Sequence, residues 1–512
     1  MATAGKQSVA ELLSLGAEAD IAIGAPDRQR LTYGGLRGLV SSVGADLAGL
    51  GLKAGDRVAM VIPNGPMAAT SFVAVAAYAC AAPLNPAYRE EEFEFYINDL
   101  RAKILLVPEG FSTPARAVAD RLGVPIVELL EDRDGPAGAF AIRHDGAKGK
   151  ATAASAGDEA LVLHTSGTTS RPKIVPLTGA NLTASAAHIA ETLTLTPADR
   201  CLNIMPLFHI HGLIAAVLSS LRAGASVYCT PGFDALKIFR WFADIEPTWY
   251  TAVPTMHQAI LSRAPRNRDV IEGLQLRFIR SSSSSLPPTV MTELEDVFGC
   301  PVIEAYGMTE AAHQMASNPL PPRLRHPGCV GIAAGPELAI LGAGGALLGA
   351  GQEGEIVIRG PNVTAGYENN PKANAEGFAD VGDGGDRWFR TGDQGILDDA
   401  GYLRITGRIK EIINRGGEKI APREVDEVIM DHPAVAQAVT FAVPHAKLGE
   451  EVGAAVVLRE GLTATPQEIR DFVSKRLADF KVPRQVLVVP EIPKGATGKL
   501  QRIGLAEKLG LC

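Results

Sequence analysis

The chain has 512 residues, of which 46% are hydrophobic and 21% are charged. At about 150 residues per domain, this length excludes a single small module, and the composition excludes intrinsic disorder because a sizeable core can be buried. The 49 Lys and Arg residues against 57 Asp and Glu residues give a net charge of −8 without any basic run, which excludes a generic nucleic-acid or anionic-membrane binder.

The cysteines and the two ends of the chain bear on its compartment. The six cysteines lie far apart, with neither a CxxC pair nor a metal-ligand spacing, which is typical of reduced thiols. No apolar run follows Lys6, so we expect no secretory signal, and residues 510–512 are not a peroxisomal SKL-type signal. These features predict a cytoplasmic protein.

Short apolar runs alternate with helical patterns over most of the chain. Buried strands are predicted at residues 58–62, 104–107, 161–164, 226–229 and 276–279, and helices at residues 180–193 and 289–298. The alanine-rich stretch 67–84 contains Thr70 and Ser71 and is broken by Pro83, so we expect a buried core helix and no membrane span. This alternation indicates an α/β fold with a largely parallel sheet covered on both faces.

The later part of the chain has a different pattern. Residues 354–359 predict antiparallel β-structure, while residues 146–157 and 379–386, rich in Gly, Ala and Asp, predict surface loops. The elements expected after Arg408 are a helix at 424–430, strands at 435–443 and 452–458, a helix at 466–477 and a strand at 485–489. They indicate a separate small α+β domain of about one hundred residues, whose boundary falls near Lys410.

The strongest local motif is LVLHTSGTTSRPK at residues 161–173, where a buried strand runs into a loop of hydroxyls, glycine and one lysine. Backbone N–H groups, hydroxyls and an ammonium in such a loop can surround phosphate oxygens. The candidate phosphate-binding residues are Thr165, Ser166, Gly167, Thr168, Thr169 and Lys173. The loop is not the GxxxxGK[ST] motif, because Gly167 is its only glycine. A polar turn between strands is the alternative.

A second motif is EAYGMTE at residues 304–310, where a strand end delivers an aromatic ring, a hydroxyl and a carboxylate. A planar base can stack on Tyr306, Thr309 can reach a phosphate, and Glu310 can bind Mg²⁺, which prefers carboxylate oxygen. A strand followed by a capped turn is an equally good interpretation of this motif alone.

Three more polar residues follow in weaker contexts. Asp393, in the RTGD motif of residues 390–393, can accept hydrogen bonds from both vicinal hydroxyls of a ribose. The planar guanidinium of Arg408 can donate hydrogen bonds to a ribose or to a phosphate. Lys499, in the glycine-containing loop 493–502, can neutralise charge that develops on phosphorus. An exposed Asp, a solvated Arg and an ordinary basic loop are the alternatives.

Taken together, the order of these five motifs closely resembles the adenylate-forming superfamily of acyl-CoA synthetases, adenylation domains and beetle luciferases. The resemblance covers nearly the whole chain. It implies a large N-terminal domain of several sheets and βα-layered subdomains (residues 1–408), a hinge (409–410, with Lys410 as the hinge residue) and a small α+β C-terminal domain (411–512) that moves as a lid. It also implies that a carboxylic acid and ATP form an acyl-adenylate and pyrophosphate, after which coenzyme A displaces AMP.

The same resemblance implies a role for each matching residue. Lys499, Thr309 and Glu310 are catalytic, Glu310 also binding Mg²⁺. The residues implied to bind ATP or AMP are Thr165, Ser166, Gly167, Thr168, Thr169, Lys173, Ser283, Glu304, Ala305, Tyr306, Gly307, Thr309, Asp393, Arg408 and Lys499. Tyr306 is expected on the adenine, and Asp393 and Arg408 on the ribose. The residues implied in the coenzyme A step are Gly416, Gly417, Glu418 and Lys419.

Residues 165–177, 280–286 and 309–321 are similar to oxalate–CoA ligases of the plant and fungal acyl-activating type. Oxalate is a very small dianion, so its pocket must be short and must hydrogen-bond a second carboxylate. The candidate donors are His209, Ser281, Ser283 and His313. If residues 281–285 are extended, alternate serines face opposite sides. A gating role for His209 and a structural role for His313 are alternatives.

Other activities share this fold. A medium-chain or aryl acyl-CoA synthetase is the main rival, because a few pocket residues decide the acid. A luciferase-type oxygenase needs a bulky aromatic pocket, an amino-acid-loading module needs a carrier domain that we do not expect after Cys512, and a non-catalytic nucleotide sensor could dispense with Lys499 or Glu310. The expected ligands are therefore ATP, Mg²⁺, coenzyme A and a small acid, with no nucleic acid and no membrane.

Overall fold

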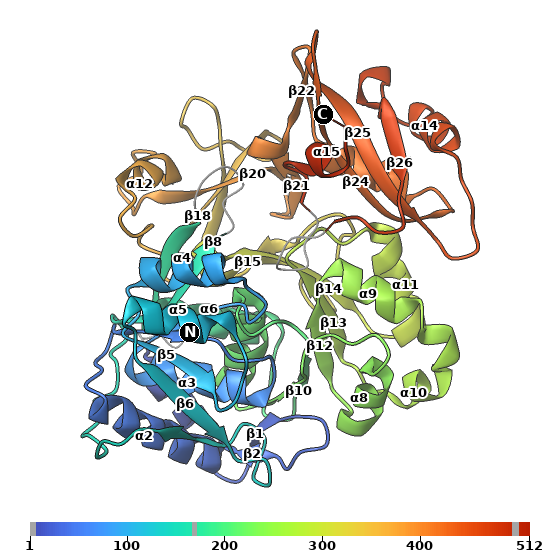
Figure 1. Ribbon diagram of the computed structural model, residues 1–512. Helices are drawn as coiled ribbons and strands as arrows, with labels where there is room; N and C mark the ends of the chain where they lie inside the picture. The colour runs from blue at the N-terminus through green and yellow to red at the C-terminus, as the bar shows by residue number, and fades with distance from the viewer. Residues whose placement is uncertain (1–6, 166–171, 494–500, 512) are drawn as a thin grey trace.

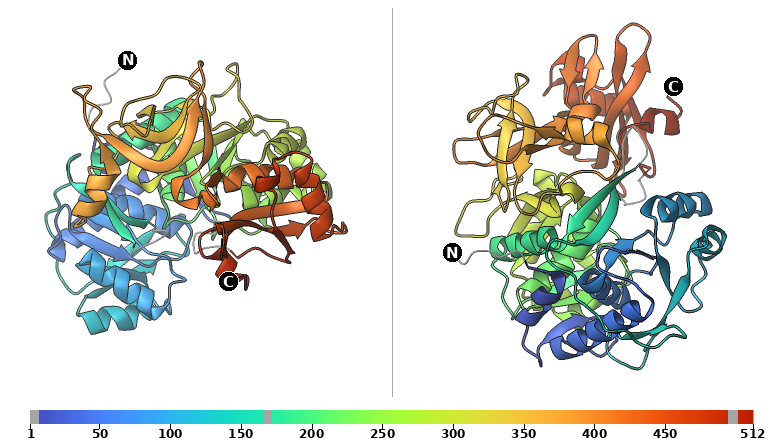
Figure 2. Two further views of the ribbon diagram at one scale, coloured as in Figure 1. Left: turned by 90° about the horizontal axis from the view of Figure 1, so that it is seen from above. Right: turned by 90° about the vertical axis from the view of Figure 1, so that its left-hand side faces the viewer.

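The computed structural model describes residues 7–165, 172–493 and 501–511 (Figure 1). Within these residues the strands form four sheets. Three of them belong to what we call the body, the described residues up to Arg408, and the fourth to the C-terminal unit, the described residues from Ile413 onward. Figures 1 and 2 show the C-terminal unit at one end of the body, next to α9 (Pro254–Leu261) and α11 (Pro288–Phe298).

The nine-stranded sheet of the body has a doubly wound, mostly parallel arrangement. Its strands in sheet order are β16 (Ile332–Ala333), β15 (His313–Ser317), β14 (Val302–Met308), β13 (Phe278–Ser282), β12 (Trp249–Ala252), β10 (Arg200–Asn203), β11 (Ser226–Cys229), β1 (Ile21–Gly24) and β2 (Leu31–Thr32). The strands from β14 to β1 pair in parallel, and β2, β15 and β16 are antiparallel. The carboxyl ends of β12, β13 and β14 therefore open at one edge, where ligands bind in such sheets.

The seven-stranded sheet is also largely parallel. Its strands in sheet order are β7 (Phe140–Arg143), β6 (Ile126–Glu131), β5 (Ile104–Pro108), β3 (Arg57–Met60), β4 (Cys80–Pro83), β8 (Glu159–Thr165) and β9 (Lys173–Thr178). Only β7 and β9, the two edge strands among the described residues, are antiparallel to their neighbours.

The two smaller sheets come from the later part of the chain. The third sheet of the body is antiparallel and contains β17 (Glu337–Leu341), β18 (Glu353–Arg359), β20 (Trp388–Leu397), β19 (Phe378–Ala379) and β21 (Leu403–Arg408). The C-terminal unit contains β23 (Glu418–Ile420), β22 (Ile413–Arg415), β25 (Gly449–Leu458), β24 (Val435–His445) and β26 (Gln485–Val488).

Helices cover these sheets. The other helices of the body are α1 (Val9–Leu12), α2 (Tyr33–Gly49), α3 (Pro66–Tyr78), α4 (Glu90–Leu100), α5 (Pro114–Leu122), α6 (Gly179–Thr192), α7 (Ser219–Arg222), α8 (Ile238–Ile245), α10 (Arg268–Gly273), α12 (Pro371–Gly377), the 3₁₀ turns η1 (Leu13–Leu15), η3 (Ala264–Arg266) and η4 (Thr309–Ala311), and the π-helix η2 (His211–Leu218). The helices and 3₁₀ turns after Arg408, the last residue of the body, are η5 (Ile409–Glu411), α13 (Pro422–Met430), α14 (Pro466–Ser474), η6 (Asp479–Lys481) and α15 (Leu505–Lys508).

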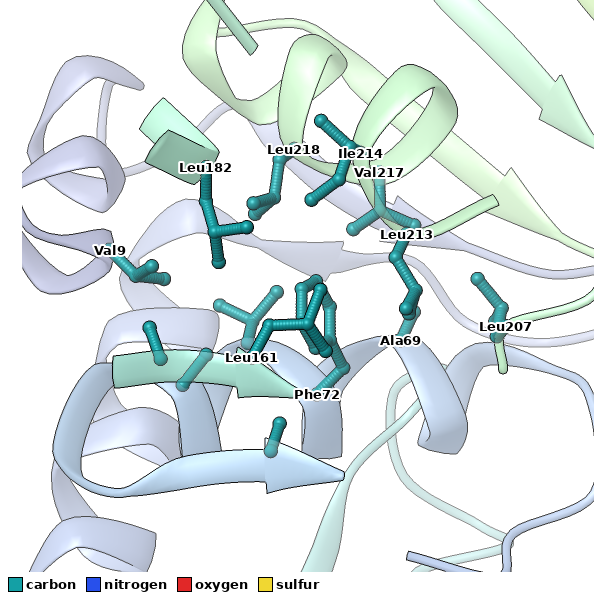
Figure 3. Packing of buried hydrophobic residues seen from close by; sticks show 14 of the residues in the cluster. Val9, Ala69, Phe72, Leu161, Leu182, Leu207, Leu213, Ile214, Val217 and Leu218 are labelled. Carbon is teal, nitrogen blue, oxygen red and sulfur yellow. The ribbon is translucent and has the colours of Figure 1, made fainter. Parts of the chain in front are cut away.

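The main hydrophobic core joins the two large sheets through helices that lie between them. Phe72 of α3, Leu161 of β8, Leu182 of α6 and Leu213 of the π-helix converge in this core (Figure 3), and all four are fully buried. Every residue of the π-helix is buried. Because π-helical turns are often found beside functional sites, its first residue, His211, is a candidate site residue.

The structure confirms the predicted α/β fold, and most predicted elements agree within a few residues. The interpretation of residues 67–84 as one helix is wrong. The helix α3 ends at Tyr78, Ala79 is extended, and Cys80–Pro83 form β4. Fully buried alanine-rich segments have no polar periodicity that separates helix from strand. The expected loop 379–386 begins in β19, and the expected helix 466–477 ends at Ser474. No helix among the described residues is both long and apolar enough to cross a lipid bilayer.

Arg502 anchors the end of the chain to the C-terminal unit. Its guanidinium contacts Asp426 of α13 at 2.6 Å and Glu411 of η5 at 3.2 Å, and donates to the Thr440 carbonyl at 3.0 Å. Burial is the largest influence on Arg502 and opposes its charge, but the two acidic partners outweigh burial and raise the pKa of the guanidinium. This contact fixes the start of the segment that follows Lys499.

We predict that Arg502→Met lowers the free energy of unfolding by about 3 kcal/mol or more, because it leaves Asp426 buried without its cation. The double variant Arg502→Met/Asp426→Asn should lose less than the single variant, since both charges are then removed. Chemical denaturation of the three proteins measures this difference, and equal losses in the single and double variants would contradict the ion-pair explanation.

Candidate active site

The site lies where the carboxyl ends of β13 and β14 meet the third sheet of the body. The β14–β15 hairpin contains the EAYGMTE motif, and β20 and β21 of the third sheet carry Asp393 and Arg408. The chain around Gly307 passes so close to β15 that a Cβ atom there would lie 2.0 Å from the His313 carbonyl oxygen. Residues far apart in the sequence therefore meet at this edge of the nine-stranded sheet.

The predicted phosphate-binding segment starts and ends on paired strands. Thr165, the last residue of β8, pairs with Lys173, the first residue of β9. Residues Ser166, Gly167, Thr168 and Thr169 lie outside the described residues. The Lys173 Nζ atom lies 4.3 Å from the centre of the Tyr367 ring, a cation–π contact. Lys173 is therefore positioned by an aromatic ring that sequence reasoning did not identify.

Tyr367 also links Lys173 to the predicted metal ligand. Its hydroxyl donates to Glu310 Oε1 at 2.8 Å, and the Glu310 carboxylate is buried. Burial raises the pKa of Glu310, although the Tyr367 hydrogen bond and the Lys173 charge act in the opposite direction. A bound cation would favour the ionised carboxylate.

The residues around Glu310 fit a magnesium ion that is held mainly by a substrate. Among the described residues, no three His, Cys, Asp or Glu side chains cluster in a way that could hold a metal. Mg²⁺ usually keeps several waters and binds through one or two carboxylates plus substrate phosphates. The single buried carboxylate of Glu310, near Lys173, matches that requirement.

The predicted ribose and adenine residues form a connected group. The Tyr306 hydroxyl donates to Asp393 Oδ2, and Arg408 Nε donates to Asp393 Oδ1 at 2.8 Å. The Asp393 carboxylate raises the pKa of Arg408, and burial, followed by the charge of Asp393, raises the pKa of Tyr306. A carboxylate has about four acceptor positions, so each oxygen of Asp393 retains one for a further donor. Two vicinal hydroxyls are a suitable pair of donors.

Other residues of the motif have structural contacts. Glu304 Oε1 accepts a hydrogen bond from the Leu286 backbone N–H at 2.9 Å, and Oε2 has no hydrogen-bond partner in the part of the chain that the structure describes. The Ala305 carbonyl accepts a hydrogen bond from Ser282 Oγ at 2.8 Å. Glu304 and Ala305 thus hold the turn after β13, while Thr309 begins the short turn η4 that carries Glu310.

Two of the predicted acid-binding residues, Ser283 and His313, meet around a histidine that we did not select. His211 Nδ1 lies 3.0 Å from Ser283 Oγ, and the His211 ring meets the His313 ring edge to face at 5.0 Å. His209 is half-buried, and its Nδ1 accepts a hydrogen bond from the His211 backbone N–H at 3.3 Å. The PLFHIHG sequence contains both histidines, but only the π-helical turn shows which one is in the core.

The predicted alternation of the serines does not extend through residues 281–285. The strand β13 ends at Ser282, and Ser283 has a φ of 74°, in the left-handed region. Ser281 is fully buried, and its hydroxyl has no hydrogen-bond partner among the described residues. The chain therefore turns at Ser283, which directs this side chain to His211 in place of a regular strand position.

Behind this group lies a charged residue that sequence reasoning also missed. Arg280, on β13, is fully buried, and it donates to Gln314 Oε1 at 3.2 Å and to Thr251 Oγ1 at 3.5 Å. Burial lowers the pKa of Arg280 to about 9. The sequence signal was weak, because the apolar stretch 276–280 contains two arginines, Arg277 and Arg280, and nothing in it distinguishes the buried one. Thr251 and Gln314 gave no signal.

The predicted hinge and coenzyme A residues lie beyond the body. Lys410 is exposed in the turn η5. Gly416 and Gly417 form the two-residue turn between β22 and β23, with φ angles of 60° and 102°. A two-residue hairpin turn with both φ values positive favours glycine at both positions. Glu418 and Lys419 follow as exposed residues of β23, and Lys499 lies outside the described residues.

A comparison with protein families matches residues 16–368 to the AMP-binding enzymes. The chain belongs to this family. Residues 424–499 match the C-terminal domain of AMP-binding enzymes. The family match is consistent with the meeting of the predicted phosphate-binding strand pair, a buried carboxylate and an Asp–Arg pair at one sheet edge.

Individual AMP-binding enzymes are similar over nearly the whole chain. An oxalate–CoA ligase of Arabidopsis thaliana is 46% identical, covering 93% of this chain and 95% of its own. An oxalate–CoA ligase of Saccharomyces cerevisiae is 43% identical, covering 88% and 86%. The ATP-bound structure of MatB from Rhodopseudomonas palustris has a TM-score of 0.86 at 30% identity, and the apo structure 0.77 at 29%, each over 98% of both chains. The ATP-bound form is therefore the more similar of the two.

Glu304 gives a pH-dependent prediction. Burial raises its pKa from 4.5 to about 7, so folding becomes less favourable as the pH rises from 4.5 to 7, where the unfolded chain has already lost the proton that the folded chain retains. Glu304→Gln keeps the acceptor for Leu286 and removes this cost, up to about 3 kcal/mol. Urea denaturation should therefore show a larger gain for the variant at pH 8 than at pH 5. The exposed Glu272→Gln is the control, and an equal gain at both pH values for Glu304→Gln would contradict the prediction.

Proposed function

We propose that this ATP-dependent acid–CoA ligase of the AMP-forming class acts on oxalate, releasing pyrophosphate, AMP and oxalyl-CoA. The observation that carries the proposal is the polar group of Ser283, His211 and His313 beside the predicted nucleotide residues. Hydroxyl and imidazole groups can donate to a carboxylate, whereas a pocket for an alkyl or aryl chain would require apolar side chains at these positions. The sequence identity of 46% and 43% to two oxalate–CoA ligases also supports this proposal.

In the first half-reaction, an oxalate oxygen attacks the α-phosphorus of ATP, and the bond to pyrophosphate breaks. Lys173 and the loop before it would bind the outer phosphates, and Tyr306, Asp393 and Arg408 the nucleoside. Glu310 would hold Mg²⁺, which neutralises phosphate charge when bound. Reactions at phosphorus depend mainly on positioning and charge stabilisation, which is what fixed cations and a buried carboxylate can supply.

In the second half-reaction, the thiol of coenzyme A attacks the carbonyl carbon of the adenylate, and AMP leaves. We propose that residues 411–512 turn about Lys410 between the two steps, so that Lys499 serves the first and the turn at Gly416 and Gly417, with Glu418 and Lys419, serves the second. Figure 1 draws β22 on the side of the C-terminal unit remote from the nine-stranded sheet. A rotation is therefore needed before its turn can contact the site.

A panel of carboxylic acids tests which acid is the substrate. Pyrophosphate release should be measured with oxalate, malonate, acetate, octanoate and 4-coumarate, each with and without coenzyme A. Oxalate should give the highest kcat/KM. A strong response to octanoate or 4-coumarate and none to oxalate would favour the medium-chain or aryl alternative and would contradict oxalate as the acid.

Lys499→Ala separates the half-reactions. Loss of one charge-stabilising donor typically lowers the rate by about 100-fold or more. The rate of adenylate formation should therefore fall by about that factor. Thioester formation from preformed acyl-adenylate should change little, because the lysine is predicted to act before the rotation. Single-turnover assays measure both steps, and an equal loss in both would contradict the assignment.

Ser283→Ala and His313→Ala test the acid-binding side. Each removes a predicted donor to oxalate and should raise the KM for oxalate by roughly tenfold or more, with less than about a twofold change in the KM for ATP. Initial-rate kinetics with each substrate varied in turn give both values. Parallel increases in the two KM values would instead indicate a disturbed fold or nucleotide site.

A further inference from the structure

Arg280 is an uncompensated positive charge in the middle of the nine-stranded sheet. Its side chain is fully buried, and no carboxylate forms an ion pair with it among the described residues. Its two hydrogen-bond acceptors, Thr251 and Gln314, are neutral. Gln314 turns its oxygen to Arg280 because its Nε2 donates to Thr192 and to the Ala334 carbonyl. A buried cation held only by neutral groups is costly for folding.

The contacts of Thr251 fix the direction of a chain of hydrogen bonds. Arg280 can only donate, so Thr251 Oγ1 is the acceptor in that contact. Thr251 is fully buried, and its other hydrogen-bond partner among the described residues is His211 Nε2, at 2.6 Å. The single hydroxyl hydrogen of Thr251 must therefore be donated to His211 Nε2, since a buried donor without an acceptor is unfavourable. A neutral imidazole that accepts at Nε2 carries its hydrogen on Nδ1.

The same direction continues to the predicted acid-binding side. His211 Nδ1 lies 3.0 Å from Ser283 Oγ, so the Nδ1–H donates and Ser283 accepts. The hydroxyl hydrogen of Ser283 is then available for a further acceptor, and no such acceptor is found for it among the described residues. Ser283 sits at the carboxyl end of β13, where its positive φ turns the chain toward His211. His313, whose ring meets that of His211, stands beside this end of the chain of hydrogen bonds.

We propose that Arg280 is a positioning and selectivity residue for the acid, acting through Thr251 and His211 so that Ser283 presents its hydrogen to a carboxylate of the substrate. The buried charge also contributes a positive potential that favours a dianion over a monoanion of the same size. This inference rests on the proposed function for the identity of the acid. It does not require Arg280 to contact the substrate.

Kinetics of Arg280→Met and Thr251→Val test this role. Thr251→Val breaks the hydrogen-bond chain at His211 and keeps the buried cation, whereas Arg280→Met removes the cation together with the donor that fixes the direction of the chain. Each should raise the KM for oxalate by about 10- to 100-fold, the usual effect of a hydrogen bond to a charged group, and leave the KM for ATP within about twofold. The preference for oxalate over the monoanion glyoxylate should fall more in Arg280→Met than in Thr251→Val, because only the former loses the charge.

Arg277→Met is the matched control. Arg277 precedes Arg280 by three residues, but its guanidinium contacts Asp199 at 2.6 Å and Thr194, outside the hydrogen-bond chain. The control should retain the preference for oxalate. Equal changes in the KM for oxalate and for ATP in Arg280→Met, or an unchanged KM for oxalate, would overturn the proposal.

The tautomer of His211 is a readout that does not depend on the acid. In protein labelled with ¹⁵N-histidine, the His211 signals, assigned by their loss in His211→Asn, should show a protonated Nδ1 and an unprotonated Nε2. Thr251→Val should shift or redistribute them, and Arg277→Met should not. A protonated Nε2 in the wild-type protein would overturn the direction of the chain. If the wild-type protein does not act on oxalate but has the expected tautomer, the proposed substrate is wrong, whereas the direction of the hydrogen-bond chain from Arg280 to Ser283 is supported.

Discussion

The close approach of β14 and β15 is the constraint on which both halves of the site depend. No side chain larger than hydrogen fits at Gly307, because a Cβ atom would collide with the His313 carbonyl. The pairing shifts register between Tyr306 and Gly307, and Ala312 and His313 both have positive φ angles. Such strained backbone is stable only where the surrounding structure enforces it. The hairpin thereby holds Tyr306 and Glu310, proposed for the nucleotide, and His313, proposed for the acid, on one short segment.

The third sheet completes what the hairpin begins. It supplies Asp393 and Arg408 from adjacent strands, and the segment between β18 and β20 supplies Tyr367, which bonds Glu310 and covers Lys173. Three sheets therefore contribute to one site, and none of them carries a complete set of groups. Small displacements between these layers would separate the groups, and misplacement by about 1 Å can be costly for catalysis. The large shared core between the two parallel sheets resists such movement.

The sequence was most informative where a function needs several groups within a few residues. The α/β class, most strands and the EAYGMTE and RTGD motifs could be predicted because periodicity and spacing are local properties. The junction of α3 and β4 could not, since a buried run of alanine and small residues suits either structure. Thr251, Tyr367 and Gln314 carry no local signal, because their importance comes from neighbours brought in from distant strands. His211 was passed over for His209 since only the π-helical turn distinguishes the buried ring from the half-buried one.

The acidic composition and the anionic ligands are reconciled by where the cations are placed. Arg408 has its own carboxylate in Asp393, so it is fixed before any nucleotide arrives and adds little net charge. Lys173 lies on an aromatic ring, which orients the ammonium without neutralising it. Arg280 is farther from solvent, and its hydrogen-bond acceptors among the described residues are all neutral. Electrostatic interactions are stronger where water is excluded. A buried guanidinium without an ion-pair partner among the described residues, behind the proposed acid-binding group, would therefore favour a dianion in a protein whose net charge repels it.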